Sequence, residues 1–289
     1  MAPELPVGLA ATLAGWVDRE LEEFTPWAGP GVTTSRSLQR FAELAILYDV
    51  LDRSPLDFAV LEDHWRPFLE RHLADPAFGQ LARTRLPWAW ALLVPYLILR
   101  RRGLRSVYHE ATLAHATRAG FPYAAEVVPY RVLDQAYFAR ASGSADVPQA
   151  VFDELLGRTF AARSACRLLL DREATYALTH ALLYASAFGQ EPVPRDALPN
   201  VAAIVDSMTI DCAVHEEYDM LGELLTCGAV VEGCRPEVRA LALPVFLQSL
   251  DDTGSLMPNG RETERSFAAC YHTTIVGLIL CASLTRMTS

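Results

Sequence analysis

The chain has 289 residues, 51% of them hydrophobic, and it carries a formal net charge of −10 with a pI near 5.2. This length and composition support a large hydrophobic core in one or at most two domains, and they exclude a largely disordered chain. The acidic balance argues against a nucleic-acid partner, because phosphate binding needs clustered basic residues. Every basic residue other than His is Arg, which excludes lysine Schiff-base chemistry and a Walker lysine.

The sequence indicates a soluble, cytoplasmic protein. Its N-terminus shows no basic stretch followed by an apolar run, so no signal peptide is expected. The longest apolar segments, Trp88 to Leu99 and Ile275 to Leu284, fall short of the ~20 residues that a bilayer span requires. The six Cys form no Cys-x-x-Cys pair, which is typical of reduced, mostly buried thiols. We expect a small-molecule substrate and no membrane or nucleic-acid partner; the oligomeric state stays open.

Helical periodicity and turn signals predict a helix in almost every segment, and no segment alternates with period two for long enough to prefer a strand. In the first half, the expected helices are Glu4 to Phe24, Ser35 to Leu51, Leu56 to Leu73, Leu86 to Arg100, Leu104 to Thr117 and Pro122 to Ala139. In the second half, they are Val151 to Leu170, Thr175 to Phe188, Leu198 to Thr209, Val214 to Val230, Glu237 to Leu250 and Ser266 to Leu284.

These expected helices alternate in character, since every second one is more apolar than its neighbours. A helix that is apolar all round is buried, whereas a helix with a polar face lies outside. The pattern therefore predicts an all-α fold, an α/α toroid of about six inner and six outer helices. We expect a single domain over residues 1–289, with a possible seam at the polar loop 141–148. An irregular all-α bundle or a helical solenoid fits the same pattern.

Polar residues gather near the expected starts of three consecutive inner helices. They are His180, the pair His215 and Asp219, and His272. His215, Asp219 and Glu223 are also spaced four residues apart, which places them on one stripe of the expected helix, with Glu223 a turn further from the toroid mouth. Three imidazoles and a carboxylate can hold zinc or iron with an open position, and such a metal lowers the pKa of bound water toward ~7. The sequence thus predicts a metal bound by His180, His215, Asp219 and His272.

The run His215-Glu216-Glu217-Tyr218-Asp219 is similar to the His-Glu-x-x-His pattern of zinc proteases, with Asp219 in place of the second His. Glu216 would then act as the base. Each candidate also has a structural interpretation. His180 fits a hydrogen-bonded core imidazole, His215 with Asp219 fits a surface helix pair, and Asp252 fits a turn residue or helix cap.

Two further groups of residues are weaker candidates. Glu110 beside His109 is expected on the surface of an outer helix. Four aromatic residues near expected helix starts either line an apolar pocket or fill the core: Trp88, Trp90, Tyr123 and Tyr176.

A resemblance to a known family covers roughly the last 80 residues. Phe246 to Gly260 reads Phe-Leu-Gln-Ser-Leu-Asp-Asp-Thr-Gly-Ser-Leu-Met-Pro-Asn-Gly, which resembles the Gln...Asp-Gly-Ser-Trp repeat of triterpene cyclases and protein prenyltransferases, with Leu256 in place of the Trp. Cys270 to Leu278 resembles the prenyltransferase β-subunit segment in which a Tyr-His-Thr-Cys run supplies a zinc-ligating His. That position is His272 here. The resemblance implies an α/α toroid.

The same family has an Asp-x-Cys pair that supplies two more zinc ligands. In this chain Asp211 and Cys212 are adjacent, and an alignment on Leu221-Gly222 places His215 where the family has the Cys. The absence of Lys removes one usual cradle for a prenyl diphosphate.

The residues and the resemblance together predict a metal-dependent enzyme, with zinc or iron, that modifies a small, partly apolar metabolite in bacterial specialised metabolism. Tyr271, next to His272, and Glu216 are candidate catalytic groups. A first alternative is a metal-free cyclase or isomerase with Asp251 or Asp252 as general acid. A second alternative is a non-catalytic toroid that binds a ligand or peptide. Dinucleotide, nucleophile-elbow and P-loop motifs are absent.

Overall fold

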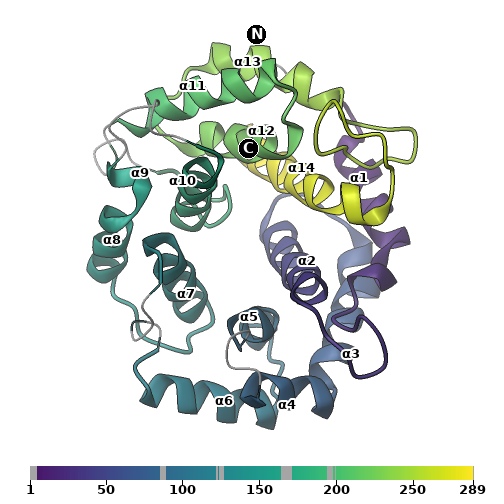
Figure 1. Cartoon of the computed structure of the whole chain (residues 1–289), viewed down its shortest axis with the longest axis vertical. Helices are drawn as coiled ribbons and strands as arrows, with labels where there is room; N and C mark the ends of the chain where they lie inside the picture. The colour runs from purple at the N-terminus through teal and green to yellow at the C-terminus, as the bar shows by residue number, and fades with distance from the viewer. Residues whose placement is uncertain are drawn as a thin grey trace. The chain divides into compact units, whose positions relative to one another are not determined.

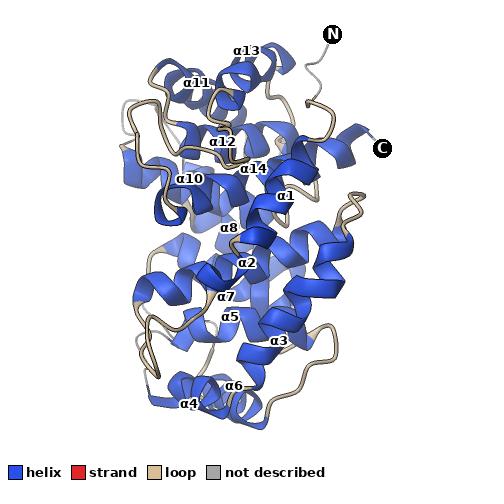
Figure 2. Cartoon of the chain, turned by 90° about the vertical axis from the view of Figure 1, so that its right-hand side faces the viewer, coloured by secondary structure: helices blue, strands red, loops and turns tan. Residues whose placement is uncertain are grey.

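The computed structural model of the chain describes residues 5–84, 89–121, 123, 127–163, 171–193, 198 and 200–288. These described residues form fourteen α-helices and two short helical turns. They contain three isolated β-bridges and no strand, as Figure 2 shows. The prediction of an all-α fold is therefore confirmed.

The chain divides into two compact units. Unit 1 comprises Met1–Arg19, Val50–Phe58 and Leu156–Ser289, and unit 2 comprises Glu20–Asp49 and Ala59–Leu155. The last boundary falls inside helix α8 (Gln149–Arg158), beyond the loop 141–148 where a seam was expected. The expected α/α toroid and the expected single domain each include residues of both units. Both therefore remain predictions.

Unit 2 contains nearly all of α2 (Ser35–Arg53), the short helices η1 (Leu21–Phe24) and η2 (Leu61–Trp65), α3 (Arg66–Ala74), α4 (Pro76–Thr84), α5 (Ala89–Arg100), α6 (Val107–Arg118), α7 (Pro129–Ala141) and the start of α8. Helix α5 is its core element, because residues 92–99 are all buried and the helix packs against α3, α4 and α7. Helix α4 was not expected from the sequence. It starts with Pro76, and Asp75 caps it by accepting the Ala77 N–H at 2.8 Å.

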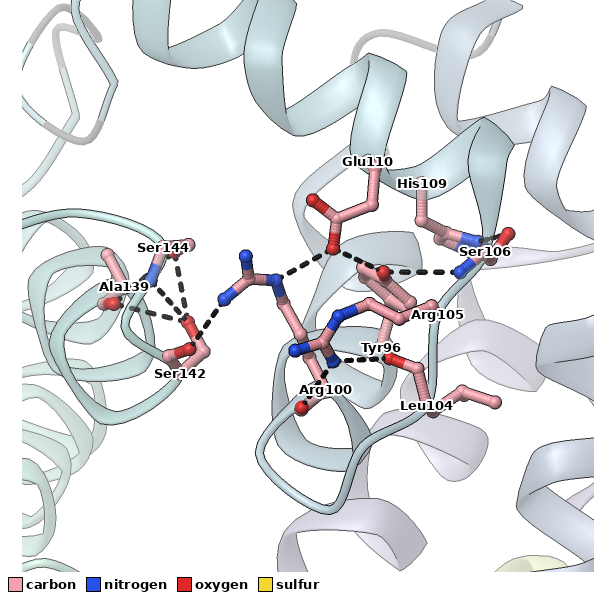
Figure 3. A network of polar contacts seen from close by, with 10 residues as sticks. All are labelled: Tyr96, Arg100, Leu104, Arg105, Ser106, His109, Glu110, Ala139, Ser142 and Ser144. Carbon is pink, nitrogen blue, oxygen red and sulfur yellow. Dashed lines mark hydrogen bonds and ion pairs between the residues drawn. The ribbon is translucent and has the colours of Figure 1, made fainter.

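A polar network in unit 2 includes Glu110, which was expected on the surface and has a side chain 38% exposed, while its neighbour His109 is fully buried. The Glu110 carboxylate accepts hydrogen bonds from the Tyr96 hydroxyl at 2.6 Å and from Arg100 Nε at 2.8 Å, while Arg100 Nη1 donates to the Ser142 carbonyl at 2.9 Å (Figure 3). This network connects α5 and α6 to the residues after α7. His109 therefore belongs to the interior of unit 2, whereas Glu110, whose side chain is 38% exposed, links these helices at the edge of that interior.

The four aromatic candidates have separate environments. Trp88 lies outside the described residues. Trp90 donates its indole N–H to buried Asp134 at 3.0 Å, which fits the core interpretation, whereas Tyr123 is 46% exposed. Tyr176 lies in unit 1 with its ring against His180.

Unit 1 contains α1 (Leu9–Arg19), α9 (Phe160–Arg163), α10 (Arg172–Ala185), α11 (Val201–Val214), α12 (Tyr218–Val230), α13 (Pro236–Leu247) and α14 (Phe267–Thr288). Helix α12 lies at its centre and contacts α10, α11, α13 and α14 (Figure 1). Nearly all of its side chains are buried, including Leu221, Leu224 and Leu225. Because α12 carries polar residues within this apolar environment, they need partners from the neighbouring helices.

The expected helix from Val214 to Val230 is wrong at its start. Helix α11 ends at Val214 and α12 begins at Tyr218, with a Schellman turn between them. In this turn Glu216 has a left-handed φ of 55°, the Glu217 N–H donates to the Cys212 carbonyl at 3.0 Å, and the Glu216 N–H donates to the Ala213 carbonyl at 3.3 Å. Glycine usually occupies the left-handed position of such a turn, so Glu216 gave no stop signal.

Helix α14 is long and apolar enough to cross a membrane by length and composition, and no other described helix is. However, 67% of its most apolar window is buried, and it packs against α1 and α12. A core helix that is covered on most sides has the same composition. Helix α14 is therefore a core helix of unit 1, beside α12. The location of the protein and its partners remain predictions.

Candidate functional site

Two carboxylates on one stripe of α12 each face an imidazole from a neighbouring helix. Asp219 Oδ1 lies 2.7 Å from His272 Nδ1 on α14, and Glu223 Oε2 lies 3.7 Å from His180 Nδ1 on α10. Residues four apart on a helix have Cβ atoms about 5–6 Å from each other. Helix α12 thus brings two carboxylate–imidazole pairs together within one turn.

Each carboxylate also accepts a hydrogen bond from a threonine that neighbours the histidine in sequence. The Thr273 hydroxyl donates to Asp219 Oδ1 at 3.0 Å, and the Thr179 hydroxyl donates to Glu223 Oε2 at 2.5 Å. Hydrogen bonds to a charged acceptor compensate part of the cost of burying it. The same local arrangement therefore supports both carboxylates.

The two pairs differ in their access to solvent. The side chains of His272 and Asp219 are 27% and 28% exposed, whereas those of His180 and Glu223 are 14% and 5% exposed. A ligand can therefore reach the first pair more easily than the second. Asp219 is in the first turn of α12, where the helix dipole favours a carboxylate, and its N–H donates to the Pro258 carbonyl at 3.0 Å.

Opposing effects act on the Asp219 carboxyl. Burial tends to raise its pKa, but the charge and hydrogen bond of His272, the Thr273 hydroxyl and the charge of Arg172 outweigh burial and hold this pKa below its ordinary value. Asp219 is therefore ionised at neutral pH. An ionised carboxylate at Nδ1 favours the tautomer with the proton on that atom, so that Nε2 on the far side of the His272 ring is the proton acceptor.

The second pair combines a buried acid with a histidine held by its own helix. His180 Nδ1 lies 3.0 Å from the Tyr176 carbonyl, and the centroids of the His180 and Tyr176 rings are 3.7 Å apart. This geometry fits the interpretation of His180 as a hydrogen-bonded core imidazole. Glu223 lies a turn deeper than Asp219, as expected, but it is the carboxylate that faces His180.

His215 does not share a helical stripe with Asp219. It caps the end of α11, its side chain is 60% exposed, and its Nδ1 lies 2.9 Å from the Asp211 carbonyl. The predicted stripe and the resemblance to a zinc-protease helix are therefore wrong at this residue. Glu216 is in the Schellman turn, with its carboxylate against Gly260, where a Cβ would collide with it. Its contacts are those of a packing residue.

The four predicted metal ligands do not come together as one group. Among the described residues, no three His, Cys, Asp or Glu side chains form a group suited to a metal ion. The 2.7 Å separation between His272 Nδ1 and Asp219 Oδ1 is a hydrogen bond, with no room for an ion between these atoms. His180 and His215 face Glu223 and Asp211 instead. Binding of zinc or iron stays a prediction.

Tyr271 lies beside this site in an aromatic stack. Its ring centroid is 5.3 Å from that of Phe267, which is itself 5.8 Å from that of Trp16. The centroids of the Tyr271 and His272 rings are 6.2 Å apart. The stack forms an apolar wall next to His272.

The two aspartates of the cyclase alternative form a turn. Asp251 Oδ1 accepts the N–H groups of Thr253 at 2.9 Å and Ser255 at 3.0 Å, and the Thr253 hydroxyl at 2.6 Å. Burial tends to raise the Asp251 pKa, but these hydrogen bonds hold it below its ordinary value, which disfavours a role as general acid. Asp252 is exposed on the same turn. The turn interpretation fits both residues.

A pocket of about 190 Å³ opens between the start of α10, the end of α11 and the start of α12. Met220 in its wall follows Asp219 in sequence, and Arg172 is close enough to lower the pKa of Asp219. The pocket therefore lies near the first carboxylate–imidazole pair, and neither Asp219 nor His272 is among its lining residues. It is lined by Asp171, Arg172, Thr175, Met208, Asp211, Cys212, His215, Glu217 and Met220.

Sequence reasoning found Asp219 and His272 but missed Arg172, Thr179 and Thr273. Thr179 and Thr273 are adjacent in sequence to candidate histidines, and this was the one local signal for them. Arg172 follows Asp171, whose carboxylate caps α10 by accepting the Ala174 N–H at 2.8 Å. A helix start predicted there would have placed Arg172 beside the site.

The comparisons with known proteins give one match. Residues 10–282 match the family model described as "Domain of unknown function (DUF6895)". No curated protein and no solved structure matches the chain. The matched range includes both carboxylate–imidazole pairs and the nearby pocket. Since the match extends over nearly the whole chain, the chain belongs to the DUF6895 family.

Proposed function

We propose that this chain is an enzyme that transfers a proton to or from a small, partly apolar molecule. His272 would serve as the acid or base, and Asp219 would be the carboxylate that positions it. The observation that supports this role is the 2.7 Å contact between His272 Nδ1 and Asp219 Oδ1 at a partly exposed position.

The chemistry follows from the two ring nitrogens of imidazole, which let a histidine side chain both accept and donate a proton. A carboxylate at Nδ1 fixes the ring and stabilises the imidazolium that forms when Nε2 takes up a proton. General acid–base catalysis of this kind typically contributes roughly 10²–10⁴-fold to a rate. Thr273 holds Asp219 in place through its hydroxyl.

The nearby pocket supplies a place for the reacting molecule. Its inner wall contains Met208, Cys212 and Met220, while charged residues line its rim. Such a mixture of apolar wall and few polar groups is typical of small-molecule sites. The likeness to prenyltransferase and cyclase repeats, which rests on sequence motifs, fits a substrate with an apolar part. We further propose a role in bacterial specialised metabolism and a cytoplasmic location.

An activated ester tests this proposal without the natural substrate. A positioned imidazole hydrolyses p-nitrophenyl acetate either as a nucleophile or as a general base, and release of p-nitrophenolate is followed by absorbance. We expect His272→Gln to reduce the protein-dependent rate by roughly 10²-fold, the lower end of a general-base contribution.

The matched control is His115→Gln, because His115 is an exposed histidine on α6 in unit 2. This variant should retain the parent rate. Equal rates in the parent and in folded His272→Gln protein, checked by circular dichroism, would refute the role of His272.

Metal dependence is the second candidate. Histidines that bind a metal often donate their other ring N–H to a carboxylate, and His272 has this arrangement with Asp219. In a metal-dependent enzyme, His272 would bind the ion through Nε2. Asp219 would hold the His272 ring in place by accepting a hydrogen bond from Nδ1. The described residues provide no complete ligand set for such an ion.

Metal analysis of protein purified without a His tag decides this candidate. Bound zinc or iron near one equivalent, lost in His272→Ala, would support it. Less than about 0.2 equivalents of any transition metal under mild purification would refute it.

A further inference from the structure

We infer that the pocket beside Asp219 binds a compact zwitterion of the amino acid type. Arg172 would bind its carboxylate, Glu217 would bind its ammonium group, and Met208 and Met220 would contact its apolar side chain. The inference names the substrate class of the proposed enzyme. The claim that this ligand is the substrate rests on the proposed function. The binding step itself is independent of His272.

The pocket has an apolar floor and a charged rim. Thr175, Met208 and Cys212 are buried at its base, whereas Arg172 and Glu217 are exposed at its edge. Ligand sites commonly combine an apolar wall with a few polar groups that fix orientation. Thioether side chains are flexible and polarisable, so Met208 and Met220 can adapt to an aliphatic group.

Two opposite charges line this space without pairing with each other. Within the described residues, the side chains of Arg172 and Glu217 form no hydrogen bond and no ion pair. A guanidinium matches a carboxylate through its fork of donors, and a carboxylate matches an ammonium group. Separate charges of both signs around one pocket therefore complement the two ends of a zwitterion.

The other acidic residues of the pocket already have roles. Asp171 accepts the Ala174 N–H as the cap of α10, and Asp211 Oδ1 lies 3.7 Å from His215 Nδ1. Glu217 is thus the carboxylate best placed for an ammonium group. The pocket is consequently amphoteric, and a simple organic cation would leave Arg172 without a partner.

The size of the pocket limits the ligand. Its volume of about 190 Å³ is below the roughly 300–1,000 Å³ of pockets for drug-sized ligands. A free amino acid with an aliphatic side chain is small enough for a pocket of about 190 Å³.

Isothermal titration calorimetry tests the inference with named probes. L-leucine and L-methionine are the zwitterions, while isopentylamine and 4-methylpentanoate each carry one of the two charges on a similar carbon chain. We expect at least one zwitterion to bind, and both single-charge probes to bind at least about tenfold more weakly, since each lacks a charge-assisted contact.

Variants assign the binding to these residues. Arg172→Gln and Glu217→Gln should each weaken zwitterion binding by about tenfold or more. The matched controls are Arg265→Gln and Glu264→Gln, which change exposed residues of unit 1 outside the pocket and should leave affinity unchanged.

Three results would overturn the inference. They are no binding of either zwitterion, equal binding of the amine alone, and unchanged affinity in both pocket variants. His272→Gln separates this inference from the proposed function, because it should retain zwitterion binding while losing ester hydrolysis. Binding combined with ester hydrolysis that does not depend on His272 would refute only the catalytic role.

Discussion

Replacement of His109 is expected to remove much of the acid sensitivity of unit 2. The imidazole is fully buried, with its ring centroid 4.5 Å from that of Tyr96 and its Nδ1 2.9 Å from the Ser106 hydroxyl oxygen. Its Nε2 is buried and has no hydrogen-bond partner in the described part of the chain. Burial lowers the pKa of His109 from its ordinary 6.5 to about 4, so the folded protein holds this ring neutral.

The sign and size of the effect follow from linkage. Because the folded pKa lies below the unfolded one, the stability linked to His109 is fully present above pH 6.5 and is lost as the pH falls toward 4. At about 1.4 kcal/mol per pKa unit, the complete loss is roughly 3 kcal/mol. At pH 5 the loss is roughly 2 kcal/mol, because the unfolded chain is already mostly protonated there.

Urea unfolding followed by circular dichroism at pH 7.5 and pH 5 measures this dependence. His109→Phe keeps an aromatic ring beside Tyr96 but cannot be protonated, so the difference in unfolding free energy between the two pH values should shrink by roughly 2 kcal/mol. His72, a half-buried imidazole whose pKa is also lowered by burial, accounts for part of what remains. His115→Gln, an exposed control, should keep the parent dependence. An undiminished dependence in His109→Phe would refute the argument.

Two further predictions concern the backbone around α12. Gly222→Ala should destabilise the protein by about 1–3 kcal/mol, because the new Cβ would lie 2.6 Å from Val276 and 2.8 Å from Phe246. Gly228→Ala on the same helix, where the nearest atom to the new Cβ is 3.7 Å away, should instead stabilise the protein by about 0.5–1 kcal/mol. Thermal unfolding measures both effects, and the same effect for both variants would contradict this account. Glu216→Gly should raise the free energy of unfolding by roughly 1 kcal/mol, because glycine adopts the left-handed backbone conformation of this position without strain. Clear destabilisation in urea unfolding would show that the contact of the Glu216 side chain with Gly260 outweighs the backbone strain.

Much of the fold could be predicted because apolar residues at helical spacing are a local signal. The range predicted from Ser35 to Leu51 agrees closely with α2, and Ser266 to Leu284 falls almost wholly within α14. The errors occur where helix ends depend on backbone geometry that the sequence does not signal, as at Glu216 in a position usual for glycine. Helix α4 was missed although Asp75 and Pro76 form a usual helix start.

The site could be predicted only in part, because its contacts join residues far apart in sequence. Asp219 and His272 were both chosen, but nothing in the sequence shows that they form a hydrogen-bonded pair across 53 positions. His180 was grouped with them, although Glu223 is its neighbour. Which carboxylate faces which histidine depends on the rotation of α10 and α14 against α12, and periodicity alone does not fix that rotation.

The central claim is that Asp219 and His272 act as one unit, and a double-mutant cycle on p-nitrophenyl acetate hydrolysis tests it most directly. Residues that act as a unit show strongly non-additive effects on a rate. We expect Asp219→Asn and His272→Gln each to slow hydrolysis, and the double variant to be no slower than His272→Gln alone. Losses that multiply in the double variant, or an Asp219→Asn variant with the parent rate, would contradict the account.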